Sequence, residues 1–275
     1  MASSHQVGNL AITMKLELYK TVIVPTLLYN MEAFGIISPE DTLTLEKYQG
    51  EVLKRLTNMP KSTAYLGILQ EIGIWRMKDM MVYRKIMLLH NILTSKDERI
   101  IKRIMLEQDQ NPTPNCWLEC LKKQLKEIGM ATDLKEIKGK TKKKIKNEAK
   151  KKIEEELIQH INKNATTKMR TVIKTQFGKK KYIDEGELSE DEIKEALKIR
   201  LHMKNYKANY KGNSSDLNCR FCHKGEETTE HIILECENLW SARRGLNLQV
   251  GDLEKDDSKV IRQVVKMSNR VEILL

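Results

Sequence analysis

The sequence is poor in aromatic residues and in proline, and it lacks the long apolar runs that cross membranes. Only 5% of its 275 residues are aromatic, and the last of its five prolines is Pro114. The apolar run from Val22 to Tyr29 is too short to span a bilayer and contains Pro25. The N-terminus lacks the basic start and apolar core of a secretory signal. We therefore expect an intracellular, nuclear protein with no membrane partner.

Charged and long aliphatic side chains are plentiful instead. Charged residues make up 32% of the chain, the formal net charge is +11, and there are 13 methionines. Abundant Lys, Glu, Leu and Ile with few aromatic residues favour helices over strands. A net charge this positive indicates a polyanionic partner, usually nucleic acid, and a solvated basic surface is the alternative.

Three of the five cysteines lie close together in the pattern C-x2-C-x8-H-x4-C, formed by Cys219, Cys222, His231 and Cys236. Structural zinc takes four tetrahedral nitrogen and sulfur ligands, with close pairs of ligands at each end of a loop. We therefore expect these four residues to bind one Zn²⁺ ion. The second pair of ligands is expected on a short helix over residues 230–239.

Three alternatives stay open for this stretch. His223 could replace His231 as the nitrogen ligand. The residues from Cys219 to His223 also spell C-x-x-C-H, a haem-attachment motif, although haem would leave His231 and Cys236 without a role. A disulfide is disfavoured because the chain is rich in lysine and shows no secretory signal.

A lysine-rich stretch precedes the cysteines. Residues 139–152 hold eight lysines and one glutamate. Apolar residues recur every four positions from Ile145 to Ile161, which predicts an amphipathic helix with a basic outer face. These lysines would contact a polyanion or form a plain solvated face. The contacts that we expect here are Lys142, Lys143 and Lys144.

A second basic stretch follows a strong helix start at Ser189, where Glu192 completes a capping box. Basic side chains hold phosphates and aromatic faces stack on bases, so their alternation is typical of nucleic-acid surfaces. We expect one continuous surface that runs from this helix to the cysteine stretch. Its expected contact residues are Lys198, Arg200, Lys204, Tyr206, Lys207, Tyr210, Lys211, Arg220, Phe221, Arg243 and Arg244.

The N-terminal third has helical periodicity. Apolar spacing and the helix start at Ser38-Pro39 predict a bundle of helices over residues 10–105. A first helix, over residues 10–24, is expected to kink or end at Pro25. The expected fold is therefore mainly α, with a helical bundle followed by a basic helical region and a small zinc-binding knuckle.

Several of these segments together resemble non-LTR retrotransposon reverse transcriptases. The N-terminal segments are similar to the region that follows the polymerase palm, and the cysteine stretch with Trp240 is similar to the zinc-binding segment near the end of those polyproteins. The likeness covers segments at both ends of the chain. In the middle of the chain, only the general character of the sequence is similar. The N-terminal segments that carry it are Leu18–Glu32, Leu45–Gln49, Leu53–Leu56, Met59–Thr63, Glu71–Gly73 and Arg84–Lys85.

The sequence also departs from that family. Such polymerases hold two metal ions with paired aspartates on a palm hairpin. This sequence has no aromatic-x-Asp-Asp turn, and its one Asp-Asp pair, Asp256-Asp257, lies in a polar tail. No proline follows Cys236, so the Pro-Asp of the endonuclease found in some relatives is missing too. The resemblance therefore implies a C-terminal remnant without palm and fingers, and we expect no catalysis.

The resemblance divides the chain into four expected regions: a thumb-like helical region (1–110), a basic helical linker (111–187), the capped basic helix with the zinc segment (188–245) and a C-terminal helix (246–275). It implies a fragment that grips template–primer or element RNA, with a polymerase domain in trans as a further partner. The alternative is a helical scaffold that binds protein through its Met- and Leu-rich faces, with a purely structural zinc. Salt dependence separates the two, because phosphate contacts release counterions.

Overall fold

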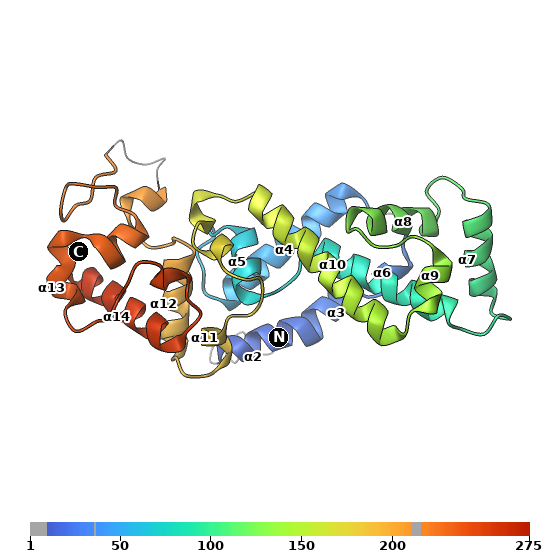
Figure 1. Ribbon diagram of the computed structural model, residues 1–275, viewed down its shortest axis with the longest axis horizontal. Coiled ribbons are helices and arrows are strands. Elements are labelled where there is room, and N and C mark those ends of the chain that lie inside the picture. The colour runs from blue at the N-terminus through green and yellow to red at the C-terminus, as the bar shows by residue number, and fades with distance from the viewer. Residues whose placement is uncertain (1–9, 36, 211–215) are drawn as a thin grey trace, which may run out of the picture. The chain divides into compact units, whose positions relative to one another are not determined.

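The computed structural model describes residues 10–35, 37–210 and 216–275, and helices dominate it (Figure 1). The mainly α fold expected from the composition is thus confirmed. Within this part of the chain, no helix is both long and apolar enough to cross a membrane. The α-helices are α2 (Ile12–Leu18), α3 (Val24–Leu27), α4 (Pro39–Leu56), α5 (Tyr65–Ile72), α6 (Met77–Leu93), α7 (Ile100–Gln110), α8 (Trp117–Glu127), α9 (Leu134–Gly139), α10 (Lys142–Lys163), α11 (Lys181–Asp184), α12 (Glu190–Arg200), α13 (Trp240–Arg243) and α14 (Ser258–Leu274).

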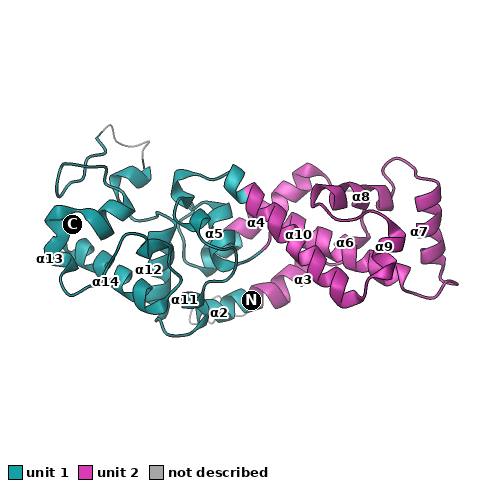
Figure 2. Ribbon diagram, viewed as in Figure 1, with its two compact units in different colours: residues 1–17, 51–74, 161–275 teal, residues 18–50, 75–160 magenta. Residues whose placement is uncertain are grey.

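The chain divides into two compact units (Figure 2). Unit 1 holds residues 1–17, 51–74 and 161–275, and unit 2 holds residues 18–50 and 75–160. Three of the boundaries fall inside helices, namely α2, α4 and α10. Each unit is thus built from segments that are distant in sequence. The four consecutive regions expected from the sequence remain a prediction.

Helix α6 is the central element of unit 2, where it contacts α7, α8 and α9. Its apolar side chains, including Val82, Ile86 and Leu89, are buried in one core with those of α8 and α10. Ile145 and Ala149 of α10 belong to this core, which confirms the predicted amphipathic helix. Each fully buried aliphatic side chain stabilises the unit by about 1.5–3 kcal/mol. The core therefore fixes α10 with its lysine-rich face outward.

The N-terminal helical segment continues past Pro25. Helix α2 is followed by a π-helical turn at Tyr19–Ile23 and then by α3, which has Pro25 in its first turn. Proline lacks a backbone N–H, and the first turn of a helix is where that group needs no intrahelical partner. Of the two expected outcomes at Pro25, a kink or an end, the helical segment does not end there, and its irregularity is the preceding π turn.

Helices α12 and α14 pack together in unit 1 (Figure 1). The predicted capping box is confirmed, since Glu192 N–H donates to Ser189 Oγ at 3.2 Å and Ser189 N–H donates to Glu192 Oε2 at 2.8 Å. The predicted C-terminal helix is present as α14, whose apolar side chains, such as Ile261 and Val264, are buried.

The Asp256-Asp257 pair has a structural position at the start of α14. Asp257 Oδ1 accepts hydrogen bonds from the backbone N–H groups of Lys259 and Val260, so it is the N-cap of the helix. Asp256 Oδ1 accepts from the backbone N–H of Tyr182 at 3.4 Å. Both carboxylates therefore accept hydrogen bonds from backbone N–H groups, Asp257 from its own helix and Asp256 from a distant segment.

Candidate metal centre

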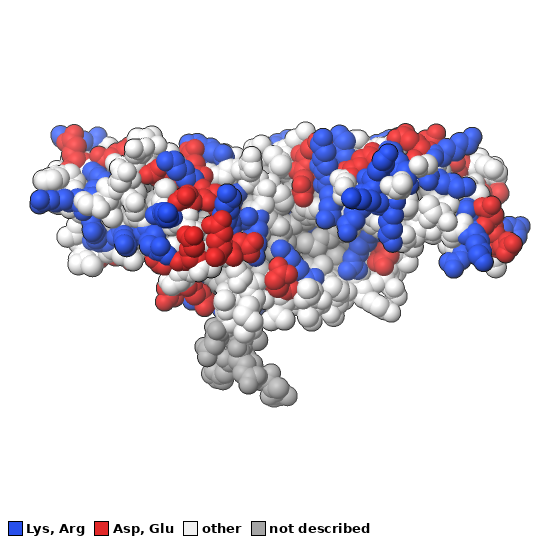
Figure 3. All heavy atoms as spheres, turned by 60° about the horizontal axis from the view of Figure 1, so that its bottom comes forward, with Lys and Arg blue, Asp and Glu red and all other residues white. Residues whose placement is uncertain are grey.

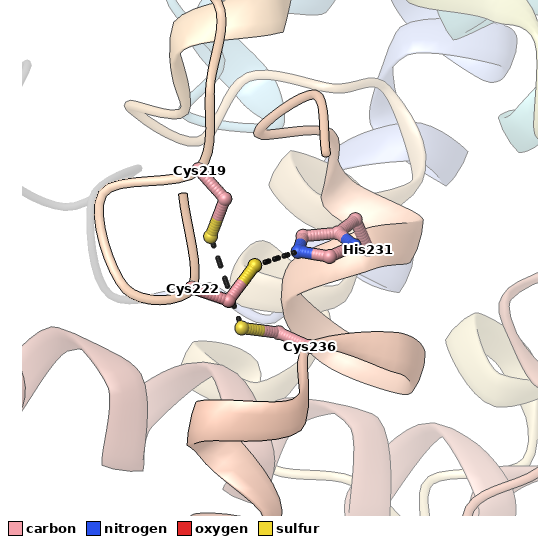
Figure 4. A group of neighbouring side chains, drawn as sticks. All are labelled: Cys219, Cys222, His231 and Cys236. Atoms are coloured by element: carbon pink, nitrogen blue, oxygen red, sulfur yellow. Dashed lines mark hydrogen bonds between the residues drawn. The ribbon is translucent and has the colours of Figure 1, made fainter. Parts of the chain in front are cut away.

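The four side chains predicted as metal ligands meet at one point in unit 1 (Figure 4). Cys219 Sγ lies 3.8 Å from Cys236 Sγ, and Cys222 Sγ lies 3.2 Å from His231 Nε2. All four ligand atoms lie within 4.8 Å of one another. Metal–sulfur bonds of about 2.3 Å at tetrahedral angles place two sulfur atoms about 3.8 Å apart. The four residues could therefore hold a single metal ion.

The first pair of ligands sits on a tight turn that opens into a loop. His223 N–H donates to the Cys219 carbonyl at 2.9 Å, which closes the turn around Cys222. Cys219 N–H donates to the Gly225 carbonyl at 2.6 Å, and the flanking residues form an isolated antiparallel bridge. Backbone hydrogen bonds thus place both sulfur atoms on the same side of the loop.

The second pair sits on a π-helical turn, His231–Glu235, with Cys236 at its end, so the short helix expected over residues 230–239 is present as a π turn followed by a 3₁₀ turn, Glu237–Leu239. Cys236 N–H donates to the His231 carbonyl at 2.7 Å, an i→i+5 bond. Residues five apart in an α-helix point about 140° away from each other, because each residue turns the helix by about 100°. The wider π turn reduces that angle and brings the thiol to the side of the imidazole. A π turn therefore suits two ligands at this spacing, and such turns are frequent at functional sites.

A buried carboxylate, that of Glu227, lies between the two ligand pairs in the sequence and holds the loop. Glu227 accepts hydrogen bonds from the backbone N–H groups of Arg220 (2.9 Å) and Lys207 (3.1 Å). It also pairs with the Arg220 guanidinium at 2.6 Å. Burial by itself would raise the pKa of Glu227, but these donors hold that pKa below its usual value. No spacing signal distinguishes Glu227 from its neighbour Glu226, so only the fold reveals its role.

Two thiols of the cluster, those of Cys222 and Cys236, have opposite electrostatic surroundings. The backbone N–H of Lys224 is the main cause that lowers the pKa of Cys222 to about 7, and His231 adds to the effect. Burial raises the pKa of Cys236 to about 12. Without a metal ion, Cys236 is therefore a neutral thiol at pH 7, while Cys222 is partly ionised.

The geometry favours His231 over His223 as the nitrogen ligand. His223 is exposed, has a φ of +57° and lies outside the cluster. His231 has its second ring nitrogen, Nδ1, facing the Glu235 carboxylate at 3.9 Å, as is common for metal-binding histidines. All five cysteines are free thiols.

Three of the predicted nucleic-acid contacts are buried, and for these residues the prediction is wrong. Arg200 is fully buried and pairs with Glu71, which lies 129 residues earlier in the chain. Lys204 is only 6% exposed and forms ion pairs with two glutamates. Tyr206 is 1% exposed. The expected continuous surface is therefore interrupted, because all three side chains are enclosed in unit 1 and the two cations are paired with glutamates there.

Three further predicted contacts are engaged locally. The Arg220 guanidinium is held by Glu227, and Lys207 pairs with Asp216 at 2.8 Å. The Arg243 guanidinium donates to the backbone carbonyl of Cys236. A phosphate would have to compete with these internal partners, so these residues are weaker candidates than the sequence indicates.

The remaining predicted contacts of that surface differ in accessibility. Lys198 and Phe221 are half-buried, and Arg244 is exposed. Tyr210 is half-buried with a lysine ammonium 4.8 Å from its ring centroid, so one face of the ring is covered. Lys211 lies outside the described residues.

The lysines predicted on the outer face of α10 are exposed. Lys142, Lys143 and Lys144 are joined there by exposed Lys146 and Lys150. None of these five ammonium groups has an ion-pair partner within the described ranges. Figure 3 shows Lys and Arg side chains gathered densely over this part of the chain. We call these five residues the α10 lysine patch.

The resemblance to reverse transcriptases rests on the sequence segments alone. Comparison of the chain with models of protein families, with curated proteins and with solved structures found no match. The family assignment therefore stays a prediction, and function has to be inferred from the geometry of the metal centre and the charge of the surface.

Proposed function

We propose that this chain is a non-catalytic nucleic-acid-binding module that grips RNA or DNA backbones through the α10 lysine patch. A Zn²⁺ ion held by Cys219, Cys222, His231 and Cys236 would fold and stabilise its C-terminal segment. The observation that carries the proposal is the lysine patch, whose five exposed charges are free of internal carboxylates and project from a helix fixed by its buried face.

The donor set supports zinc as the metal. Three thiolates and one imidazole form a closed tetrahedral set that suits zinc, whereas magnesium and calcium prefer oxygen ligands. Four protein ligands leave no open position for a catalytic water or a substrate. The ion would therefore have a structural role.

The free lysines support the phosphate backbone as the ligand. A lysine that already pairs with a carboxylate must break that pair before it binds phosphate, and the α10 lysine patch has no such cost. Each phosphate neutralised on a duplex makes the logarithm of affinity fall with the logarithm of salt by about 0.9. Five contacts would give a slope of up to about −4.5.

Fluorescence anisotropy of labelled duplex DNA and single-stranded RNA, measured over a series of salt concentrations, tests the proposal. We expect measurable binding at near-physiological salt and a steep negative slope for both ligands. Undetectable binding, or a slope near zero, would reject the proposed function. Because the lysines contact the backbone, exchanging the base sequence should change the affinity little.

The metal centre should bind zinc more tightly as the pH rises. Zinc binds the thiolate form, so binding must release the proton that Cys236 retains in the metal-free protein, where its pKa is raised to about 12 by burial. Below pH 7 the Cys222 thiol contributes a further proton. The apparent affinity should therefore increase at least about tenfold per pH unit between pH 6 and 8. Competition with a chelator at each pH measures this, and a flat profile would contradict the assigned ligands.

The resemblance of the N-terminal segments supports a place for this module in a retrotransposon reverse transcriptase, after the palm. In that setting its N-terminal helices would form the thumb-like part that follows the template–primer duplex. A polymerase domain in trans would then supply the chemistry.

One feature of unit 2 favours the alternative of a protein-binding scaffold. Helix α7 exposes Ile100, Ile101 and Ile104, and the latter two line an apolar hollow of about 400 Å³ together with Met105 and Trp117. Exposed apolar patches of this kind often mark protein contacts. Binding to a protein through this hollow would depend only weakly on salt, which separates it from binding through lysines.

A further inference from the structure

The chain has three tryptophans, and one of them is placed very differently from the other two. Trp75 and Trp117 are half-buried, and each indole N–H donates to an oxygen within unit 2. Trp240 is 65% exposed and begins α13, four residues after the last metal ligand. An indole left in water exposes a large apolar surface, and such rings are enriched where a partner covers them.

Two exposed arginines, Arg244 and Arg270, lie at the end of the helix that begins with this indole. Arg270 of α14 donates to the backbone carbonyls of Ala242 (2.6 Å) and Arg244 (3.0 Å), which holds its guanidinium against the end of α13. Arg244, at the end of this short helix, is exposed as well, and neither Arg244 nor Arg270 forms an ion pair in the described part of the chain. The Arg243 guanidinium is held by the Cys236 carbonyl and is left out. We call Trp240, Arg244 and Arg270 the Trp240 patch.

Nearby acidic groups do not offset this charge. Glu237, three residues before Trp240, pairs with Lys224 at 2.7 Å, so its charge is already neutralised. The Trp240 patch therefore combines an exposed apolar ring with a net positive charge. Proteins that bind single strands combine a positive surface with aromatic side chains on which bases stack.

We propose that the Trp240 patch binds single-stranded nucleic acid, with the indole stacked on one base and the arginines on the adjacent phosphates. The inference rests on the proposed function and adds to it a preference for unpaired strands at the metal-binding end of the chain. Paired bases inside a duplex cannot offer a free face to the indole, so the duplex would still bind the α10 lysine patch but not this ring. The arginines have no carboxylate partners, which favours a phosphate chain over an acidic protein.

Tryptophan fluorescence tests this directly, because Trp240 is the exposed indole. Titration of the full chain with an oligothymidylate of about ten nucleotides should quench the emission, whereas a duplex should not. Trp240→Ala should abolish the quenching and weaken single-strand binding, followed by anisotropy, by about 5- to 150-fold. Trp240→Phe should recover part of the affinity. The matched control is Val250→Ala, which shortens another exposed apolar side chain of unit 1 and should change nothing.

The outcomes separate this inference from the proposed function. If the wild-type chain binds neither single strand nor duplex, the proposed function fails and this inference fails with it. If the chain binds both but Trp240→Ala binds single strands as well as the wild type does, only the stacking inference fails, and the indole is then assigned to a protein partner. Equal weakening for duplex and single strand would also overturn stacking. An unchanged zinc content in Trp240→Ala shows that the segment is still folded.

Discussion

Cys236→Ser is expected to release the metal ion and to unfold the segment around it. The side chain is fully buried and is one of the four ligands, and a serine hydroxyl is a poor replacement for a thiolate. Zinc binding in small domains contributes about 10–16 kcal/mol that is coupled to local folding. Elemental analysis should therefore fall from one zinc per chain towards none, and limited proteolysis should cut between Cys219 and Cys236.

Two matched variants control this experiment. Cys116→Ser changes a half-buried thiol in unit 2, outside the cluster, and should keep the full zinc content. His223→Ala should also keep the ion, whereas His231→Ala should lose it. Full zinc in both Cys236→Ser and His231→Ala would overturn the ligand assignment, and loss in His223→Ala alone would move the nitrogen ligand.

The consequences of metal loss should spread through one hydrogen-bonded network. Burial lowers the pKa of His202 to about 4, so the ring is neutral at pH 7 and joins Thr171 (2.8 Å) to Thr229 (3.0 Å) in the metal-binding loop. Arg170 pairs with Glu230, next to His231, at 2.8 Å. Hydrogen exchange should therefore rise around residues 166–175 as well as in the loop, while unit 2 keeps its protection.

The ligand set was predictable because its chemistry is local. Cysteine and histidine at these intervals have few other uses, so the spacing points to Cys219, Cys222 and Cys236 and leaves His231 and His223 as alternative nitrogen ligands. The π turn that makes an i→i+5 pair converge could not be predicted, since no propensity signal distinguishes it from an α-helix. Glu227 was not found for a similar reason, because acidic residues are common in this loop and only burial distinguishes one of them.

The basic surface near the metal centre was less predictable, because charge in a sequence does not reveal burial. Arg200 and Lys204 sit on a stretch that alternates basic and aromatic residues, yet their partners lie far away in the chain. By contrast, the apolar residues that recur every four positions in α10 predict both the helix and its buried face. Its buried face determines its exposed face, so the positions of Lys142 and its neighbours followed from the sequence.

Replacing Lys142, Lys143 and Lys144 together by glutamine is expected to flatten the salt dependence of binding to every polyanion. The three ammonium groups are exposed and unpaired, so glutamine removes charge without breaking an internal contact. Loss of three duplex phosphate contacts would change the slope by up to about 2.7 and weaken binding at 0.1 M salt by as much as about 500-fold. Anisotropy titrations of the variant and the wild type on the same duplex measure both quantities.

The matched control removes the same charge from lysines that are already paired. Lys78, Lys174 and Lys194 form ion pairs with acidic residues, so their joint replacement by glutamine lowers the net charge equally without touching the α10 lysine patch. If this control weakens binding as much as the α10 variant, overall charge and not the patch holds the nucleic acid. If only the α10 variant loses affinity and slope, contact is made at that helix, because a diffuse electrostatic attraction would not distinguish two variants of equal charge.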